Sequence, residues 1–357
     1  MIVPSSISNS NERIPPAPWG KLWLLAMSIV VVSVTGWECF WRSRGFVPSL
    51  TDDAQLWAAA RTQVGRKDKD AVVLLGTSRM QLGLNVGEFA RSTGIRPVQL
   101  AMNGELPIVP LRSLVDDPSF SGVIICELSE DWMSPETVGG KAAEWIQVYE
   151  HQTWSSRLEQ WLGRLTQDTF VFRLPDLAPL RVWHHLLEGT APTPSYVKVL
   201  PDRSILADYT KLDAADQRRH REEVVRESYA RQPPWPPAEF RERAHELGEL
   251  IEPLRARGGA VIFVRFPTSG TLWELQNQRY PRAQYWDVLG PETGAFTIHF
   301  KDYPELARFE CPDGSHLDYR DAVPFTHALG GLVVDHLRAK ASERSRSARA
   351  QSGAAAL

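Results

Sequence analysis

The sequence predicts an α/β fold: a doubly wound, mainly parallel sheet with a mostly helical insertion and one N-terminal transmembrane helix. Three observations predict it. Short apolar runs that stop at a Gly or a polar residue are typical of buried parallel strands. These runs alternate with stretches of helical length, as strand–helix–strand units require. One uncharged apolar stretch near the N-terminus is almost long enough to cross a bilayer.

Composition places limits on the class of protein. The chain has 357 residues, is 43% hydrophobic and carries a net charge of −3, so a sizeable core is expected. Without a basic surplus, a nucleic-acid partner is not expected. Three cysteines, Cys39, Cys126 and Cys311, are too few for a disulfide scaffold. Cys126 and Cys311 either pair in an oxidising compartment or, as we favour, are two small buried side chains.

The apolar stretch near the N-terminus is the first expected element. Residues 22–37 carry no charge, and counting on to Trp41 gives a length adequate for a transmembrane helix. Tryptophans flank both ends, where the aromatic side chains of spanning helices gather. We therefore predict a disordered tail at residues 1–20 and a transmembrane anchor at residues 21–41.

Two other interpretations of this stretch are open. A cleaved signal peptide is the main one, but no A-x-A-like cleavage site follows the apolar run. A buried helix of a soluble protein would be unusually apolar on all sides. Basic residues on both flanks barely discriminate between orientations. Because a short tail before a single anchor commonly stays in the cytoplasm, we expect the domain on the periplasmic or extracellular side of the cell inner membrane.

Residues 42–340 are expected to form the α/β domain. Residues 52–64 have the composition of a helix with an Asp near its start. Three apolar runs then predict strands, within AVVLLGTSR (71–79), RPVQLAMNG (96–104) and SGVIICELSED (121–131). A second block contributes a helix that ends at two glycines, a fourth strand in AVIFVRFP and a last helix, at residues 239–259, 260–267 and 322–340.

An insertion at about residues 136–240 separates the two blocks. It lacks apolar runs of strand quality, so we expect a mostly helical cap. Residues 211–231 predict a highly charged, exposed helix, and PPWPP at 233–237 predicts a stiff break. Four tryptophans suit either sugar binding or, as their spacing favours, the core of this cap: Trp145, Trp154, Trp161 and Trp183. The Ala-, Ser- and Arg-rich tail at 341–357 is expected to be disordered.

Polar residues gather where the predicted strands end. In an open parallel sheet, sites form beyond the carboxyl ends of the strands, so these side chains are expected to lie near one another. The first strand is followed by Ser78 and Arg79, the second by Asn103 and Gly104, the third by Glu127, Glu130 and Asp131, the fourth ends at Arg265, and the last helix is preceded by Asp313 and His316.

Ser78, His316 and Asp313 are the candidate catalytic residues. A hydroxyl nucleophile needs a base within hydrogen-bond reach, and the base needs an acid that orients it. Asp313 and His316 lie three residues apart in DGSH, a loop that can curl through Gly314. Each piece alone has an ordinary explanation, as a helix N-cap or a turn. Their order and their placement at strand ends together favour a site.

These motifs resemble the SGNH (GDSL-like) hydrolase superfamily over roughly residues 70–135 and 258–338. Gly76-Thr77-Ser78 stands where the family has its Gly-Asp-Ser nucleophile turn, and Asp313-x-x-His316 matches its last motif. The family also has a Gly after the second strand and an Asn after the third, and this chain has Gly104 and Asp131 there. The chain resembles in particular the membrane-anchored branch of alginate and other cell-surface polysaccharide O-acetylation proteins.

The resemblance implies a serine-dependent acyl-ester enzyme without a cofactor. Its substrate would be a polysaccharide or glycan ester, and it would act as an O-acetyltransferase or an O-acetylesterase. In the family, N–H groups of the nucleophile and the Gly bind the oxyanion with the Asn amide, which implies this role for Ser78 and Gly104. Asp131 departs from the pattern, since a carboxylate repels an oxyanion unless it is protonated or turned away. Asn103 could supply the missing amide.

The resemblance also implies a partner. Acetyl-CoA is absent outside the cytoplasm, so a transferase there needs an acyl donor handed across the membrane, and a multi-spanning membrane acyltransferase would supply it. The rival interpretation is a non-catalytic scaffold or binding module for polysaccharide assembly. The acid at Asp131 is the feature that favours this rival.

Arg79 and Arg265 are expected to flank the pocket. They either bind a substrate carboxylate, as on a uronic acid sugar, or form ion pairs with Glu127 or Glu130. The sequence leaves these two interpretations even.

A metal site is not expected. The remaining histidines have no convincing ligand spacing with acidic partners. A metal held by Asp313 and His316 would leave Ser78 unexplained.

Overall fold

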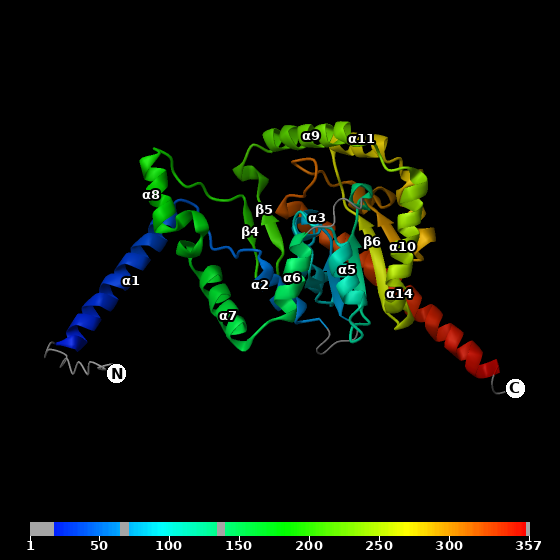
Figure 1. The fold of residues 1–357 in the computed structure, drawn as a ribbon, viewed down its shortest axis with the longest axis horizontal. Coiled ribbons are helices and arrows are strands. Elements are labelled where there is room, and N and C mark those ends of the chain that lie inside the picture. Colours follow the sequence, from blue (N-terminus) through cyan, green and yellow to red (C-terminus); the bar gives the residue numbers. More distant parts are fainter. Residues whose placement is uncertain (1–17, 65–70, 134–139, 355–357) are drawn as a thin grey trace, which may run out of the picture.

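Five parallel strands form the central sheet of the protein (Figure 1). The computed structural model describes residues 18–64, 71–133 and 140–354. The strands lie in the order β2-β1-β3-β6-β7, with bounds Val98–Gln99, Val72–Leu75, Val123–Glu127, Ala260–Arg265 and Phe296–His299. The predicted α/β class with a parallel sheet is therefore confirmed.

Four of these strands lie in the predicted apolar runs, but β7 was not predicted. Its sequence, FTIH, mixes polar and apolar residues, and only its last two residues are buried. It forms one edge of the sheet, where it pairs with β6 alone. An edge strand needs fewer apolar side chains than a central one, so the apolar-run pattern is weak there.

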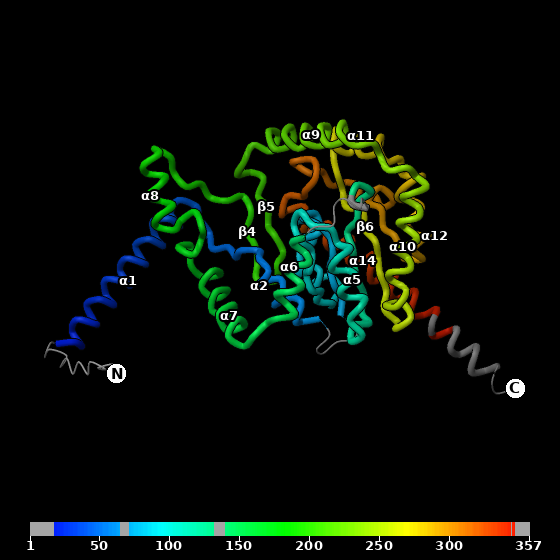
Figure 2. The backbone as a smooth tube through the Cα atoms, in the orientation of Figure 1, coloured from blue at the N-terminus to red at the C-terminus, as the bar shows by residue number. Residues whose placement is uncertain are grey.

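Helices cover both faces of the sheet, so the core has two layers (Figures 1 and 2). Alternate strand residues point to opposite faces: Val73 and Leu75 pack in one layer, Val72 and Leu74 in the other. The first layer takes side chains from α2 (Ala54–Arg61), α5 (Ile108–Val115), α6 (Gly140–Glu150), α10 (Pro237–Ala256) and α12 (Trp286–Thr293). The second takes them from α3 (Ser78–Gly83), α4 (Val86–Thr93), α13 (Pro304–Ala307) and α14 (Tyr319–Ala354).

The two buried cysteines belong to different layers. Cys126 packs in the first layer and Cys311 in the second, and both are free thiols. Because the sheet lies between the layers, the two sulfurs are not placed to pair. The interpretation as small buried side chains is confirmed.

The insertion is mainly helical, as predicted, but it also contains a small sheet. Its helices after α6 are α7 (Trp154–Thr169), α8 (Pro179–Leu187) and the charged α9 (Ala214–Arg231). The antiparallel strands β4 (Val197–Val199) and β5 (Ile205–Ala207), which the sequence analysis missed, lie between α8 and α9. Each has three residues, too few to give a recognisable apolar pattern.

Three of the four insertion tryptophans contradict the prediction that they form the core of a cap. Only Trp145 is buried, against the first layer. Trp154, Trp161 and Trp183 are 86%, 53% and 58% exposed. The spacing in α7 does place apolar residues on one face, but that face points away from the domain.

The predicted disordered tail at 341–357 is also wrong for most of its length. The last helix, α14, continues through residue 354. The tail is rich in Ala and Arg, which have high helix propensity, and this outweighs its Ser content. The predicted disordered N-terminal tail lies outside the described residues up to residue 17.

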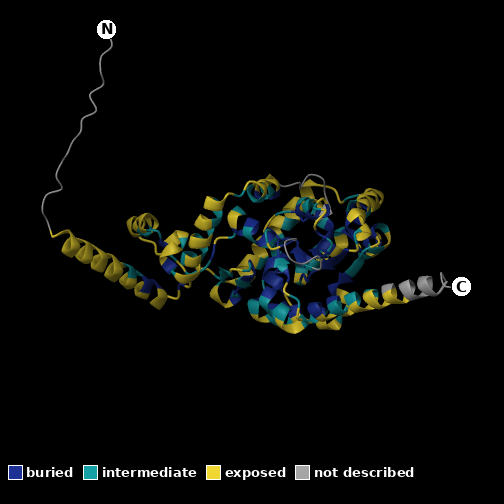
Figure 3. Cartoon of the chain, turned by 90° about the horizontal axis from the view of Figure 1, so that it is seen from below, coloured by how far each residue is buried: buried dark blue, intermediate teal, exposed yellow. Residues whose placement is uncertain are grey.

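Helix α1 (Trp19–Ser43) is long and apolar enough to cross a membrane, and only 6% of its apolar window is buried (Figure 3). That exposure does not fit the core helix of a soluble protein. Its last turns are nevertheless built into the domain: Trp41 packs with Phe46, Val171 and Leu177. Removing α1 would expose this cluster, which favours a retained helix over a cleaved signal peptide.

Arg203 fastens the insertion to the edge of the main sheet. It lies in the turn between β4 and β5 and is fully buried. Its Nε and Nη2 donate to the two carboxylate oxygens of Asp52, at 2.8 and 3.0 Å. Its Nη1 and Nη2 also donate to the backbone carbonyls of Gln99 and Ala101, at 2.8 and 2.9 Å. One guanidinium therefore joins the insertion, the segment before α2 and the β2 edge.

We predict that Arg203→Met lowers the free energy of unfolding by about 3–5 kcal/mol, because it leaves a partly buried carboxylate without its cation. The measurement is urea denaturation of the full chain in detergent, followed by fluorescence. The matched control is Arg219→Met, which breaks an exposed ion pair with Asp216 and should cost less than about 1 kcal/mol. Equal losses in the two variants would contradict the role given to Arg203.

Candidate active site

Ser78 begins helix α3 directly beyond the carboxyl end of β1. Strands β2 and β3 flank β1 on opposite sides, so the order in which strands are added to the sheet reverses at this point, where open α/β folds form their clefts. The turn requires glycine at position 76, which has φ +147°. A Cβ there would lie 2.7 Å from Cβ of Glu127, a distance too short for any side chain.

Glu127, at the end of β3, holds this turn in place. Its Oε2 accepts hydrogen bonds from the backbone N–H and the hydroxyl of Thr77, at 2.8 and 2.9 Å. Thr77 in turn caps the start of α3. A fully buried carboxylate with these donors fixes the position of the next residue, Ser78.

The structure brings Ser78, His316 and Asp313 together. Ser78 Oγ lies 2.7 Å from His316 Nε2, and His316 Nδ1 lies 2.8 Å from Asp313 Oδ2. The loop curls through Gly314, at φ +84°, so that Asp313 Oδ1 also accepts the backbone N–H groups of Ser315 and His316. A hydroxyl, a base and an orienting acid are thus connected in that order.

Two residues of the insertion complete the surroundings of Asp313, and the sequence analysis missed both. Tyr209 Oη donates to Asp313 Oδ2 at 2.9 Å, and Arg221 Nη2 donates to the same oxygen at 3.0 Å. Tyr209 follows β5, whereas Arg221 projects from α9. Neither residue belongs to a recognisable motif, so no signal in a single sequence points to them.

The charges around this group favour a neutral base. Burial lowers the pKa of the His316 imidazole, and the charges of Arg221 and Arg79 lower it further, against the opposing effect of Asp313. Burial alone would raise the pKa of Asp313, but His316 and Arg221 outweigh burial and hold that pKa far below its ordinary value. At neutral pH the acid is therefore ionised, and the imidazole is free to accept the Ser78 proton.

The predicted oxyanion residues do not contact this group by hydrogen bonds in the described structure. Asn103 and Gly104 form an exposed turn after β2, with Gly104 at φ +74°. A Cβ on Gly104 would meet nothing within 4 Å, so the space beside this turn is open. Lys141 donates to the backbone carbonyl of Asn103 at 3.1 Å.

Asp131 is bound by groups on other elements. Its carboxylate accepts from Tyr229 Oη on α9, at 2.8 and 2.9 Å, and from Gln276 Nε2 on α11 (Gly270–Arg279), at 3.2 Å. Burial, followed by the charge of Glu130, raises the pKa of Asp131. Both carboxylate oxygens therefore have donors, and the negative charge is disfavoured at this position.

Two roles were predicted for Arg265, binding of a substrate carboxylate or an ion pair, and the structure shows the ion pair. Its Nε donates to Glu130 Oε2 at 3.0 Å, and its other two nitrogens donate to Phe266 O and Gln276 Oε1. The side chain is fully buried. Binding a substrate carboxylate would require breaking these bonds, so the structure favours the ion-pair role of the two left open for Arg265.

Arg79 lies closer to the candidate catalytic residues. Its Nε donates to Ser315 Oγ at 3.1 Å, and its Nη1 lies 3.5 Å from Ser129 Oγ and 3.6 Å from Glu127 Oε1. Arg79 therefore connects the turn that carries Ser78, the end of β3 and the loop that carries His316. Arg79 is buried and is therefore placed to position these elements.

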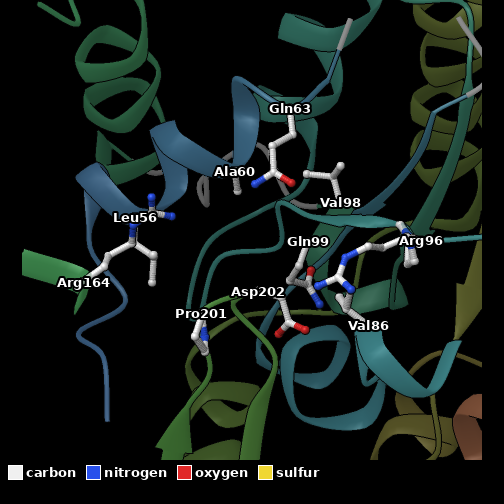
Figure 4. A pocket seen from close by; sticks show the side chains of 11 residues that line it. Leu56, Ala60, Gln63, Val86, Arg96, Val98, Gln99, Arg164, Pro201 and Asp202 are labelled. Atoms are coloured by element: carbon white, nitrogen blue, oxygen red, sulfur yellow. The ribbon is translucent and has the colours of Figure 1, made fainter. Parts of the chain in front are cut away.

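Within the described residues, no group of three or more His, Cys, Asp and Glu side chains could hold a metal ion. A cavity of about 120 Å³ lies elsewhere, beside the β2 edge (Figure 4). Its lining includes Leu56, Val98 and Gln99 together with the charged Arg96 and Asp202. None of its lining residues belongs to the Ser78 group.

Comparison with known proteins gives no match: neither the protein-family models nor the curated proteins contain one for this chain. What the site can do must therefore be argued from its own geometry.

We predict that Arg221→Gln moves the acid limb of Ser78 reactivity to higher pH. The ordinary pKa of a histidine side chain is 6.5. Because the pKa of His316 is lower in the native protein, its imidazole becomes protonated only at a pH below that value. Removing the cation raises the pKa of His316, so protonation abolishes reactivity at a higher pH. The measurement is the rate of labelling by a fluorophosphonate as a function of pH.

The control for this pH shift is Arg219→Gln on the same helix, which changes an exposed arginine that pairs with Asp216. Its profile should coincide with that of the native protein. An unchanged acid limb in Arg221→Gln would contradict the electrostatic role of Arg221.

Proposed function

We propose that the protein is a membrane-anchored, serine-dependent acyl-ester enzyme of the SGNH kind. It acts on cell-surface or extracellular carbohydrate as an O-acetyltransferase or an O-acetylesterase. The observation that carries the proposal is the 2.7 Å contact between Ser78 Oγ and His316 Nε2, with Asp313 bound to the opposite ring nitrogen. An ordinary serine in the first turn of a helix needs no such connection to a buried histidine and carboxylate.

In the proposed reaction, Ser78 Oγ attacks the ester carbonyl and passes its proton to His316 Nε2. Asp313 stabilises the imidazolium that forms. The imidazolium then protonates the leaving alkoxide, which leaves an acyl-serine. In the second half, His316 takes a proton from water or from a sugar hydroxyl, and that oxygen attacks the acyl-serine. The bond between Ser78 Oγ and the acyl group then breaks, and the imidazolium returns its proton to Ser78 Oγ. Water gives an esterase, whereas a sugar hydroxyl gives a transferase.

The proposed oxyanion donors are the backbone N–H groups of Ser78 and Gly104. The open space beside Gly104 supports this role, because an acyl group needs room there. The Asn103 amide lies on the same turn and is the proposed third donor. Asp131 is bonded to Tyr229 and Gln276, which gives its carboxylate partners other than the oxyanion.

The setting of the proposed enzyme is the outer side of the inner membrane, with α1 as its anchor. No cofactor is required by this chemistry. For the transferase, the acyl donor is supplied by a multi-spanning membrane acyltransferase. The apolar, exposed surface of α1 supports the anchor.

A second candidate function is a non-catalytic scaffold for polysaccharide assembly. The observation that favours it is Asp131, an acid hydrogen-bonded to Tyr229 and Gln276 where the resemblance calls for an amide donor. A scaffold has no need of an activated Ser78, so the two functions differ in one measurable property.

We predict that Ser78 is covalently labelled when the full chain in detergent is incubated with a fluorophosphonate. Ser78→Ala should remove the adduct, and His316→Ala should slow labelling by about 10²–10⁴-fold, as loss of a general base does. The adduct is located by peptide mass spectrometry. The full chain is used because α1 is packed into the domain.

The matched control is Ser155→Ala, an exposed serine on α7 that should leave the labelling rate unchanged. A folded protein that is not labelled, or is labelled equally well in His316→Ala, would contradict the enzyme and favour the scaffold.

A further inference from the structure

Helices α7 and α8 each present an apolar face to the outside of the molecule. On α7 the exposed apolar residues are Trp154, Leu158, Trp161, Leu162 and Leu165, which recur at the spacing of one helix face. On α8 they include Leu180, Trp183 and Leu187. Neither helix has a buried residue. Each is therefore amphipathic with its apolar side unpartnered in the monomer.

The exposed apolar surface of the described chain is concentrated in one region. All exposed large hydrophobic side chains except Val224 lie within residues 19–47 or 154–187. These two ranges contain α1 and the α7–α8 segment, and Figure 1 shows α7 and α8 beside the C-terminal end of α1. The rest of the described surface has the polar character of an ordinary soluble domain. Two apolar surfaces so confined and so close favour one common environment.

The connection between these surfaces is fixed by hydrogen bonds. Residues 171–177 join α7 to α8 and contribute Val171 and Leu177 to the cluster around Trp41 of α1. Glu38, in α1, accepts the backbone N–H groups of Val171 and Phe172 at 3.1 and 2.9 Å. The apolar faces of α7 and α8 are thus held at the end of the only described helix that could span a membrane.

We propose that α7 and α8 lie in the interface of the bilayer that α1 crosses, with their apolar faces inserted at the level of the lipid headgroups. The occupant of these faces is lipid, because they continue the lipid-facing surface of α1. Tryptophan on both helices is the residue that favours this depth. Residues 154–188 carry four arginines and four carboxylates, so the contact depends on apolar burial and needs no anionic lipid.

The test uses the full chain, with Cys39→Ser so that the buried Cys126 and Cys311 are the only native thiols. Leu158→Cys or Leu187→Cys is labelled with an environment-sensitive fluorophore, and the protein is reconstituted in phosphatidylcholine vesicles. Lipids with a spin label near the headgroup should quench both probes, and we expect this quenching to be roughly threefold or more stronger than for a water-exposed probe. Both should be shielded from iodide in the water.

Two matched positions give the controls. Glu227→Cys, on the exposed side of α9, should be quenched by iodide and not by labelled lipid. Val30→Cys, exposed in the middle of α1, should be quenched by lipids labelled deep in the acyl chain. These controls define the water and bilayer limits for the same protein.

Three results would overturn the proposal. Probes at 158 and 187 that are as accessible to iodide as the probe at 227 would place the helices in water. Probes shielded from iodide but insensitive to labelled lipid would show that protein, either a second copy or a partner, covers the faces. A probe at residue 30 that labelled lipid does not quench would show that α1 does not cross the bilayer.

Discussion

A carboxylate buried in a protein must be surrounded by hydrogen-bond donors, and the candidate site depends on how Asp313 meets this requirement. Its donors come from its own loop, from Tyr209 beyond β5 and from Arg221 on α9. With the loop alone, the carboxylate of Asp313 would have fewer hydrogen-bond donors and its pKa would be higher. The insertion is therefore part of the candidate site, because it sets the charge and the position of the group that orients His316.

A second buried carboxylate plays the corresponding part for Ser78. Glu127 holds the turn that precedes Ser78, and Arg79 joins that turn to the His316 loop through Ser315. The two halves of the site lie 238 residues apart in the sequence. Their relative position is therefore fixed by a few polar contacts within the core, and polar networks of this kind are rigid only when most members are satisfied.

Much of the sheet and the three central residues could be predicted, because their signals are local. Buried strands such as β1 and β3 need continuous apolar residues, and a turn such as Asp313–His316 brings its own residues together. The partners of Asp313 could not be predicted, since nothing near Tyr209 or Arg221 in the sequence encodes a contact about a hundred residues away. The spacing of Trp154 and Trp161 was recognised, but a pattern gives only the direction of a face relative to its helix, not whether protein or another phase covers it.

The hydrogen bonds from Val171 and Phe172 to Glu38 limit the positions that the domain can take relative to α1. A domain joined to its anchor by a flexible linker can reach many positions, whereas a domain held against the end of its anchor has one distance from the membrane and one orientation. Where α1 crosses a bilayer, Ser78 is held at one height above it. For the proposed carbohydrate enzyme, substrate selection therefore depends on where a polymer emerges as well as on its chemistry, and lengthening the junction would change which polymer chains it can meet.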